Sequence, residues 1–150
     1  MFSQNLIFTL SEPEKKRPIM KFGTAVNCID GRVQYPVLDY LNRNFDLEFF
    51  DSPNEAGPLH ILTDRSDQCR LISLKEQIRV SVEEHGSRLI ALVGHHDCAG
   101  NPVKREIQEK QIIDALAYLR RAFGKHILYV GLYVNEQWKV EEYTRIEPET

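Results

Sequence analysis

The sequence predicts an α/β fold in which helices flank a mainly parallel central sheet of about four to five strands. Apolar runs alternate with amphipathic stretches along the chain, in the order β, α, β, α, β, α, β, β. Such alternation is typical of parallel strands that are joined by right-handed helical crossovers. The last two runs, "HILYVGLYV" and "WKVEEYTRI", lie on either side of the turn-like "NEQ" and predict a C-terminal antiparallel hairpin.

The first half of the chain predicts a strand, a helix and a second strand. "GTAVNCID", residues 23–30, is a short β-rich run, and "LEFFD", residues 47–51, is the next strand candidate. Between them, residues 35–45 carry apolar side chains at helical spacing, namely Val37, Leu38, Leu41 and Phe45. We expect "EAGPLHILTD", residues 55–64, to be irregular because its glycine and proline interrupt any period.

The second half predicts two long helices around a buried strand. Residues 65–86 form the first helix, which ends at Gly86 and has one apolar face made of Leu71, Leu74, Ile78 and Val82. "RLIALVG", residues 88–94, is continuously apolar, as expected of a strand that is covered on both faces. Residues 103–124 form the second helix, with Pro102 at a helix start, where proline is tolerated.

Length and composition indicate a single domain over residues 1–150, with residues 1–21 as an N-terminal extension or arm. Hydrophobic residues make up 42% of the chain, which is enough for one core. The 19 basic and 22 acidic residues are spread along the sequence, so we expect no nucleic-acid partner. The sequence shows neither a signal-peptide pattern nor an apolar stretch of roughly 20 residues, so we expect a cytoplasmic protein without a membrane partner.

Sulfur and imidazole groups follow two of the predicted strands. Cys28 closes the first strand, in "CID", while His95 and Cys98 follow the third, in "GHHDC". Because ligands collect at the carboxyl ends of parallel strands, the fold can bring these three side chains together. Two thiolates and one imidazole leave one position of a tetrahedral zinc ion open, as in catalytic zinc sites. Sulfur and nitrogen ligands also favour zinc over oxygen-binding ions such as magnesium.

Each of these residues also has a simpler interpretation. Cys28 can be a small buried hydrophobic residue. His95 and His96 can form hydrogen bonds with backbone groups in a loop. Asp30 and Arg32, which lie close by in "CIDGR", can form an ordinary surface ion pair near a helix start.

The other cysteine and histidines have no partner at a useful spacing. Three cysteines are too few and too scattered for a disulfide framework. We expect Cys69, inside a predicted helix, to be packed against neighbouring residues. We expect His60, His85 and His126 to lie on the surface or at helix ends.

The stretches "CIDGR" and "GHHDC" together resemble the two signatures of the β-class carbonic anhydrases, Cys-x-Asp-Ser/Ala-Arg and Gly-His-x-x-Cys followed by small residues. The matching positions are Cys28, Asp30, Arg32, Gly94, His95, Cys98 and Gly100. The resemblance continues through "RVQYPVLDYL" and "YVGLYVNEQWKVE", so it spans most of residues 22–142. It implies a short, divergent member of this family with a β-carbonic-anhydrase-like fold.

The resemblance implies a Zn²⁺ ion held by Cys28, His95 and Cys98. The fourth ligand is then water or, in a closed and inactive form, the Asp30 carboxylate. A two-pronged ion pair with Arg32 would hold that carboxylate away from the metal. The implied activity is the reversible hydration of carbon dioxide to bicarbonate by a metal-bound hydroxide, with Asp30 and Arg32 as catalytic residues.

Two neighbours of the second signature have roles that stay open. His96, beside the expected ligand, either relays protons or packs and forms hydrogen bonds locally. Asp97 is expected to orient its loop or to cap the following turn.

The chain also departs from the family pattern. Gly31 stands where the family has serine or alanine, and "DSPNEAG", residues 51–57, replaces an Arg-Asn-Ala-Gly type segment that helps to shape the active-site wall. Residues 1–21 do not clearly supply the helical arm that commonly wraps a partner subunit. Family members are dimers with sites near the subunit interface, so we expect a homodimer or a higher homo-oligomer.

Three functions are compatible with these residues. The first is that of a carbonate dehydratase, a zinc lyase. The second is that of a zinc-binding protein of the same fold without hydration activity, or with another substrate, which the different wall segment favours. The third is hydrolysis of carbon disulfide or carbonyl sulfide, which shares the metal chemistry and differs in the access route to the site.

Overall fold

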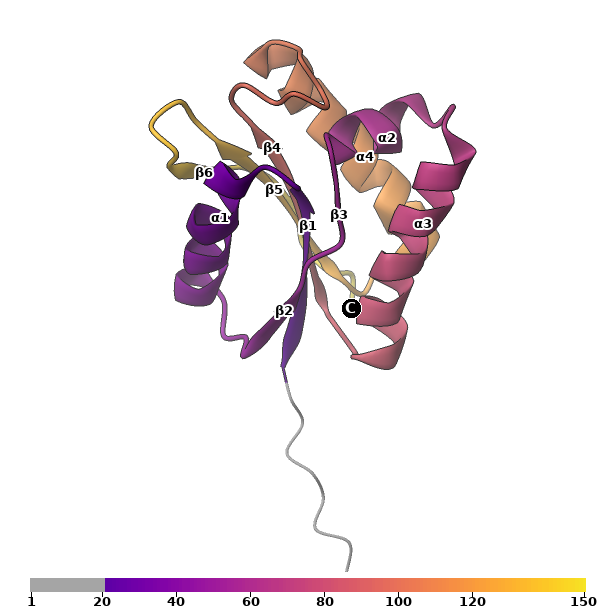
Figure 1. Cartoon of the computed structure of the whole chain (residues 1–150). Coiled ribbons are helices and arrows are strands. Elements are labelled where there is room, and N and C mark those ends of the chain that lie inside the picture. Colours follow the sequence, from indigo (N-terminus) through magenta and orange to yellow (C-terminus); the bar gives the residue numbers. More distant parts are fainter. Residues whose placement is uncertain (1–20) are drawn as a thin grey trace, which may run out of the picture.

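The computed structural model describes residues 21–150, in which helices cover both faces of one mixed sheet (Figure 1). The strands are β1 (Phe22–Cys28), β2 (Phe49–Asp51), β3 (Asn54–Glu55), β4 (Leu89–His95), β5 (Leu128–Val134) and β6 (Val140–Ile146). Their order is β2-β1-β4-β5-β6, and β3 pairs with β1 beyond β2. Every pair is parallel except β5 with β6, which is antiparallel. The predicted fold class and the C-terminal hairpin are confirmed.

The helices lie on opposite sides of the sheet. They are α1 (Gly31–Asn44), α2 (Pro58–Asp64), α3 (Gln68–Arg79) and α4 (Arg105–Phe123), and a π-helical turn, η1 (Val80–Glu84), follows α3. Figure 1 shows α1 on one face and α2, α3 and α4 on the other. The described residues include no helix with both the length and the apolar character that crossing a membrane requires.

Strand β4 is the centre of the molecule, and all seven of its residues are buried. Its side chains alternate between the two faces, as the strand period requires. Ile90 and Leu92 belong to the core under α2, α3 and α4, whereas Ala91 and Val93 belong to the core under α1. The continuous apolar run that predicted a doubly covered strand is therefore explained by two separate cores.

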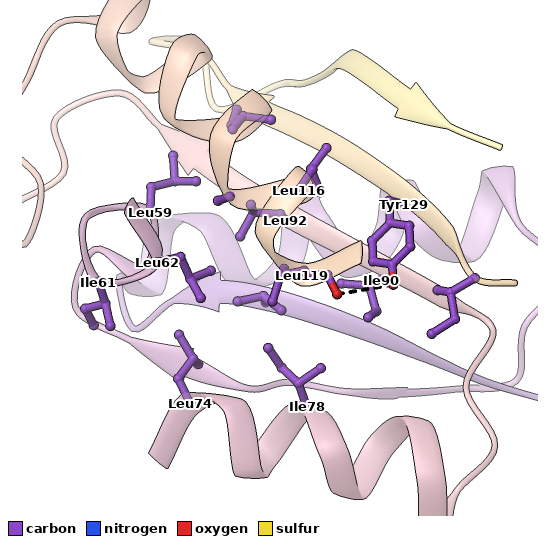
Figure 2. Close-up of a cluster of buried hydrophobic side chains, with 14 of the residues drawn as sticks. Leu59, Ile61, Leu62, Leu74, Ile78, Ile90, Leu92, Leu116, Leu119 and Tyr129 are labelled. Carbon is purple, nitrogen blue, oxygen red and sulfur yellow. Dashed lines mark hydrogen bonds between the residues drawn. The ribbon is translucent and has the colours of Figure 1, made fainter. Parts of the chain in front are cut away.

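The larger core lies between the sheet and the helices α2, α3 and α4 (Figure 2). Leu62 of α2, Leu74 of α3 and Leu116 of α4 are each at most 1% exposed. Burying a leucine side chain contributes about 1.5 to 3 kcal/mol, so this layer supplies much of the stabilisation of the fold. Tyr129 also lies here, and its hydroxyl donates a hydrogen bond of 2.7 Å to the Gly124 carbonyl.

The segment 55–64, expected to be irregular, instead ends β3 and forms helix α2. Gly57 adopts a left-handed conformation with φ of 67° just before the helix, and Pro58 occupies its first position. Proline is suited to that position because its φ is already helical and its missing N–H has no partner there. The glycine and proline therefore start a helix, which is why the expectation was wrong.

Three helix boundaries also differ from those predicted. The helix expected at residue 65 begins at Gln68, because the Asp67 side chain accepts a hydrogen bond from the Arg70 N–H at its N-terminus. Helix α1 begins earlier than residue 35, and α4 begins at Arg105, beyond Pro102. Gly86, in a left-handed conformation, lies just beyond η1, near the predicted stop. Of the predicted N-terminal extension, residues 1–20 lie outside the described residues.

Candidate metal centre

The carboxyl ends of β1 and β4 bring the two cysteines and the histidine together. The strands are parallel neighbours, so Cys28 at the end of β1 and His95 at the end of β4 reach the same edge of the sheet. Cys98 lies in the turn after β4. One candidate ligand atom from each residue lies within 4.8 Å of the other two, and the residues are 3%, 1% and 5% exposed, respectively. The structure therefore brings together three residues that lie up to 70 positions apart.

The spacing of the sulfur atoms suits a metal ion. The Cys28 and Cys98 Sγ atoms are 3.9 Å apart, and both cysteines are free. Two thiolates on a tetrahedral zinc ion, with Zn–S bonds of about 2.3 Å, would lie about 3.8 Å apart. In the part of the chain that is described, the cluster contains no carboxylate oxygen. The donor set is thus two sulfurs and one nitrogen, which fits zinc.

A hydrogen bond at Nδ1 orients the His95 imidazole. Its Nδ1 lies 2.7 Å from the His96 carbonyl oxygen. Because a carbonyl only accepts, Nδ1 carries a proton, and in the neutral imidazole, the form that binds a metal, Nε2 keeps its lone pair. Nε2 is buried and has no hydrogen-bond partner. A buried acceptor without a partner is costly, so this lone pair indicates a missing ligand.

The two thiols share one site and affect each other's ionisation. The hydrogen bond from the Cys98 thiol lowers the pKa of Cys28 well below its usual range. The same hydrogen bond, with the Cys28 thiolate as acceptor, raises the pKa of Cys98. A thiol that binds a divalent metal ion loses its proton, so metal binding would release the proton that the pair retains.

Two glutamine amides, one buried and one partly buried, hold the backbone at the site. Gln108 of α4, only 2% exposed, accepts a hydrogen bond of 2.9 Å from the His95 N–H and donates one of 2.8 Å to the His95 carbonyl. Gln34 of α1 donates to the carbonyl oxygens of Cys28 and Asp30 at 2.7 and 2.8 Å. Sequence analysis missed both residues. A glutamine on the inner face of an amphipathic helix was the available signal for Gln108.

Asp30 and Arg32 form a two-pronged ion pair. The Asp30 side chain caps α1 by accepting a hydrogen bond of 2.9 Å from the Arg32 N–H. Arg32 Nε lies 3.0 Å from Asp30 Oδ1, and Nη2 lies 2.6 Å from Oδ2. This guanidinium holds the pKa of Asp30 down at about 2. The carboxylate is therefore ionised at neutral pH and engaged with Arg32.

The same guanidinium also contacts the β4 loop and the β5–β6 turn. Arg32 Nη1 donates to Asp97 Oδ2 and Nη2 to the Asp97 carbonyl, both at 3.1 Å. The ring of Trp138 lies under the guanidinium, with its centroid 4.4 Å from the Arg32 Cζ. His96 is exposed and its ring meets that of Trp138 edge-on at 6.2 Å. Sequence analysis gave Trp138 no role at the site.

The segment 51–57 packs directly against the second signature. A Cβ on Gly57 would lie 2.4 Å from the Gly100 carbonyl carbon, and a Cβ on Gly100 would lie 2.3 Å from the Ala56 carbonyl carbon. Arg70 of α3 donates to Glu55 Oε2 at 3.1 Å and to the Ala56 carbonyl at 3.1 Å. The pocket on this side of the site, lined in part by His95 and Cys98, is too small for a water molecule.

The remaining residues that the sequence singled out lie away from the cluster. His60, His85 and His126 are exposed, as expected. Cys69 is also exposed, so its expected packing was wrong. It lies on the outer face of α3, two residues before Leu71 turns inward. Gly31 is exposed and a Cβ there would meet nothing within 4 Å.

Two solved structures have a similar fold. A structure from a study of two tetrameric β-carbonic anhydrases of the filamentous ascomycete Sordaria macrospora matches with a TM-score of 0.56 and 11% identity, over 83% of this chain and 80% of that chain. A carbonic anhydrase from Glaciozyma antarctica matches with a TM-score of 0.53 and 16% identity, over 87% of each chain. The protein therefore has the β-carbonic anhydrase fold, as the two signatures implied.

The family follows from the sequence itself. The sequence model of the family described as "Putative carbonic anhydrase" matches residues 19–144. The chain belongs to this family. No curated protein matches the sequence.

Proposed function

We propose that this protein is a zinc enzyme that catalyses the reversible hydration of carbon dioxide to bicarbonate. The observation that carries the proposal is His95, whose buried Nε2 has no hydrogen-bond partner and whose ring offers a nitrogen within 4.8 Å of the sulfur atoms of Cys28 and Cys98. These three residues would hold the ion. The family and the fold both support carbon dioxide hydration as the general activity. A bound zinc ion supplies a Lewis acid that lowers the pKa of a coordinated water to about 7.

The residues around the cluster then have defined tasks. Arg32 keeps the Asp30 carboxylate ionised and engaged in two hydrogen bonds, so that this carboxylate leaves the fourth position to water. The ionised Asp30 is also the acceptor that would orient the attacking water. Gln108 fixes the backbone of His95, which in turn fixes the position of its ring. The closed alternative, with Asp30 in the fourth position, requires the ion pair with Arg32 to break.

We also propose a homodimer or a higher homo-oligomer in a reducing compartment such as the cytoplasm. Four large hydrophobic side chains on and around α1 are exposed, namely Ile29 before the helix, Tyr35 and Leu38 within it, and Phe49 of β2. Ile29, 61% exposed, stands between Cys28 and Asp30. A subunit partner would cover such exposed apolar side chains, and the three free cysteines suit a reducing environment.

One specific observation favours a second candidate function, that of a zinc-binding protein without hydration activity. The pocket beside His95 and Cys98 has no room for water, and Gly57, which lines it, ends the segment 51–57 that differs from the wall of the family. In this case the ion would be bound and the substrate would have no route to it from this side.

The first experiment measures zinc by elemental analysis on protein that was purified without added metal. Carbon dioxide hydration is followed on the same sample at neutral and alkaline pH, with carbonyl sulfide and carbon disulfide as parallel substrates. We expect about one zinc ion per chain together with carbon dioxide turnover. Zinc without turnover of carbon dioxide would favour the second candidate, and turnover of a sulfur substrate alone would favour the hydrolase. Absence of tightly bound metal would refute the zinc site.

A further inference from the structure

Arg32 is half exposed, yet three separate segments of the chain hold its guanidinium group. Asp30, at the start of α1, binds Nε and Nη2, while Asp97, in the loop after β4, binds Nη1 and Nη2. Trp138, in the turn between β5 and β6, covers one face of the group. The Arg32 side chain is 45% exposed, so burial alone does not fix its orientation. The three contacts must do so.

The two carboxylates compete for the donors of the same guanidinium. The Asp97 side chain is 69% exposed, whereas that of Asp30 is only 17% exposed. A rotation of the guanidinium toward Asp97 and solvent would therefore release the Asp30 carboxylate. Such a movement would also carry the guanidinium away from an aromatic ring that lies against its face, and the cation–π contact would be lost. The Trp138 ring lies there, with its centroid 4.4 Å from the Arg32 Cζ.

The turn holds Trp138 in an uncommon conformation. Its φ is 58°, which is rare for a bulky residue. Its N–H donates to the Asn135 carbonyl at 2.9 Å, and Asn135 Oδ1 accepts from the backbone N–H groups of Gln137 and Lys139 at 3.0 Å. Strain of this kind persists only where the surroundings impose it, and it tends to occur at functional sites.

We propose that Trp138 is a positioning residue, whose ring fixes the Arg32 guanidinium in the orientation that keeps the Asp30 carboxylate engaged and off the metal. The inference rests on the proposed zinc site and adds the β5–β6 hairpin to the groups that keep the site open. Trp138 acts through Arg32 and touches no reacting atom.

The first test uses Trp138 as its own reporter and needs no metal. The chain contains one tryptophan, so tryptophan fluorescence reports on the surroundings of this one ring. In the metal-free protein, we expect Arg32→Ala to change the emission wavelength and the quenching of Trp138. The control variant Arg79→Ala removes an arginine of α3, on the other face of the sheet, that pairs with Glu76, and should leave the emission unchanged. An emission unaffected by Arg32→Ala would overturn the inference without bearing on the zinc site.

The second test loads the protein with Co²⁺, whose visible spectrum reports on its ligands. Wild type, Arg32→Ala, Trp138→Leu and Trp138→Phe are compared at one neutral pH. We expect the spectrum of Trp138→Leu to shift toward that of Arg32→Ala, and that of Trp138→Phe to stay close to wild type because phenylalanine retains an aromatic face. In the zinc-loaded enzymes, Trp138→Leu should reduce carbon dioxide hydration by about 10-fold, the size of a partly desolvated cation–π contact, and Trp138→Phe should restore most of it.

Tyr143→Leu is the matched control, since it removes an exposed aromatic side chain from β6 in the same hairpin. It should leave both spectrum and rate unchanged. A Trp138→Leu protein with the wild-type spectrum and rate would overturn the role of Trp138 and leave the zinc site intact. A wild-type protein that binds neither cobalt nor zinc would overturn the proposed function and this inference with it.

Discussion

At the amino end of the sheet, three hydroxyl groups are buried together, and at the carboxyl end two thiols and an imidazole are buried together. In the first cluster, Thr24 donates to Ser87 at 2.9 Å and Ser87 donates to the Leu89 carbonyl at 2.8 Å. The remaining hydroxyl, that of Ser81, lies 2.6 Å from Thr24 and is left as its donor. Every proton in this chain of hydrogen bonds has an acceptor inside the protein.

The carboxyl-end cluster is different because it ends on an open lone pair. His95 Nε2 has no partner, and the two thiols facing it have one hydrogen bond between them. Both clusters have the same depth of burial and both join β1 to the neighbourhood of β4. The difference shows that burial of polar groups does not by itself identify a functional site. An unsatisfied acceptor beside further metal-ligating atoms does identify such a site, because a bound ligand would remove the free-energy cost of leaving that acceptor unpaired.

The largest expected effect comes from removing one ligand of the carboxyl-end cluster. Cys98→Ser should reduce zinc affinity on the order of 1000-fold, because a thiolate ligand is lost from a three-residue site. Metal content after dialysis against a weak chelator measures this. Cys69→Ser is the control, since this exposed cysteine lies outside the cluster. Full zinc retention by Cys98→Ser would remove Cys98 from the proposed site.

A substitution in the amino-end cluster of hydroxyl groups should change stability and not metal binding. Thr24→Val keeps the shape of the side chain but deprives Ser81 of its acceptor and Ser87 of its donor. We expect the free energy of unfolding to fall by about 1 to 3 kcal/mol, measured by urea denaturation of the metal-free protein. Zinc affinity should stay at the wild-type value. A Thr24→Val protein of unchanged stability, or one that loses zinc, would contradict the distinction between the clusters.

A second satisfied polar group, the Tyr129 hydroxyl, gives a test by pH. Burial raises the pKa of Tyr129 to about 12, whereas an unfolded tyrosine ionises at about 10. The unfolded state therefore releases its proton first, and this tyrosine's contribution to stability is present below pH 10 and lost as the pH rises toward 12. Tyr129→Phe should be less stable by about 1 kcal/mol at pH 8, where it lacks the hydrogen bond to Gly124.

The stability difference between wild type and Tyr129→Phe should then shrink between pH 10 and pH 12. Other tyrosines, lysines and thiols titrate alike in both proteins, so the difference isolates Tyr129. Urea denaturation at several pH values measures it. A difference that is constant with pH would show that the hydroxyl is not held neutral by burial.

The smallest expected effects concern backbone conformation at two glycines. A Cβ at Gly31 or at Gly86 would meet no atom within 4 Å, but Gly86 has a φ of 73° and Gly31 is the first residue of α1. Gly31→Ala should therefore raise the free energy of unfolding by about 0.5 kcal/mol, and Gly86→Ala should lower it by about 1 kcal/mol. Thermal melts of the two variants give both values. Equal shifts in one direction would refute the assignment of the difference to backbone conformation.

The sequence predicted the elements whose signals are local. The apolar run at 88–94 and the apolar face of 65–86 each reflect a period of one strand or one helix, so β4 lies where it was expected, and α3 and η1 fall within the expected helix. Cys28 and His95 could be placed at one edge of the sheet because parallel strands end together. The segment 55–64 was misread because the local signal of Gly57 and Pro58 is ambiguous between a break and a helix start.

The contacts that complete the site could not be predicted, because they join segments distant in sequence. Trp138 lies 106 positions from Arg32, the guanidinium that it covers. The close approach of Gly57 to Gly100 depends on how α2 packs beside the β4 loop. Neither Trp138 nor Gly57 has a spacing signal that points to its partner. Gln108 is the exception, since an amide on an inner helix face indicates a buried polar partner even before its identity is known.

The contact between Gly57 and Gly100 limits which positions can be substituted in a library of variants that reshapes the entrance to this site. Here two main chains meet with no room for a side chain between them, so a larger residue at either position would push the segment 51–57 off the loop that carries Cys98. Diversity belongs at exposed neighbours such as Ser52 and Asn54. Both glycines should be kept, since their contact fixes the position of the segment while its other residues are varied.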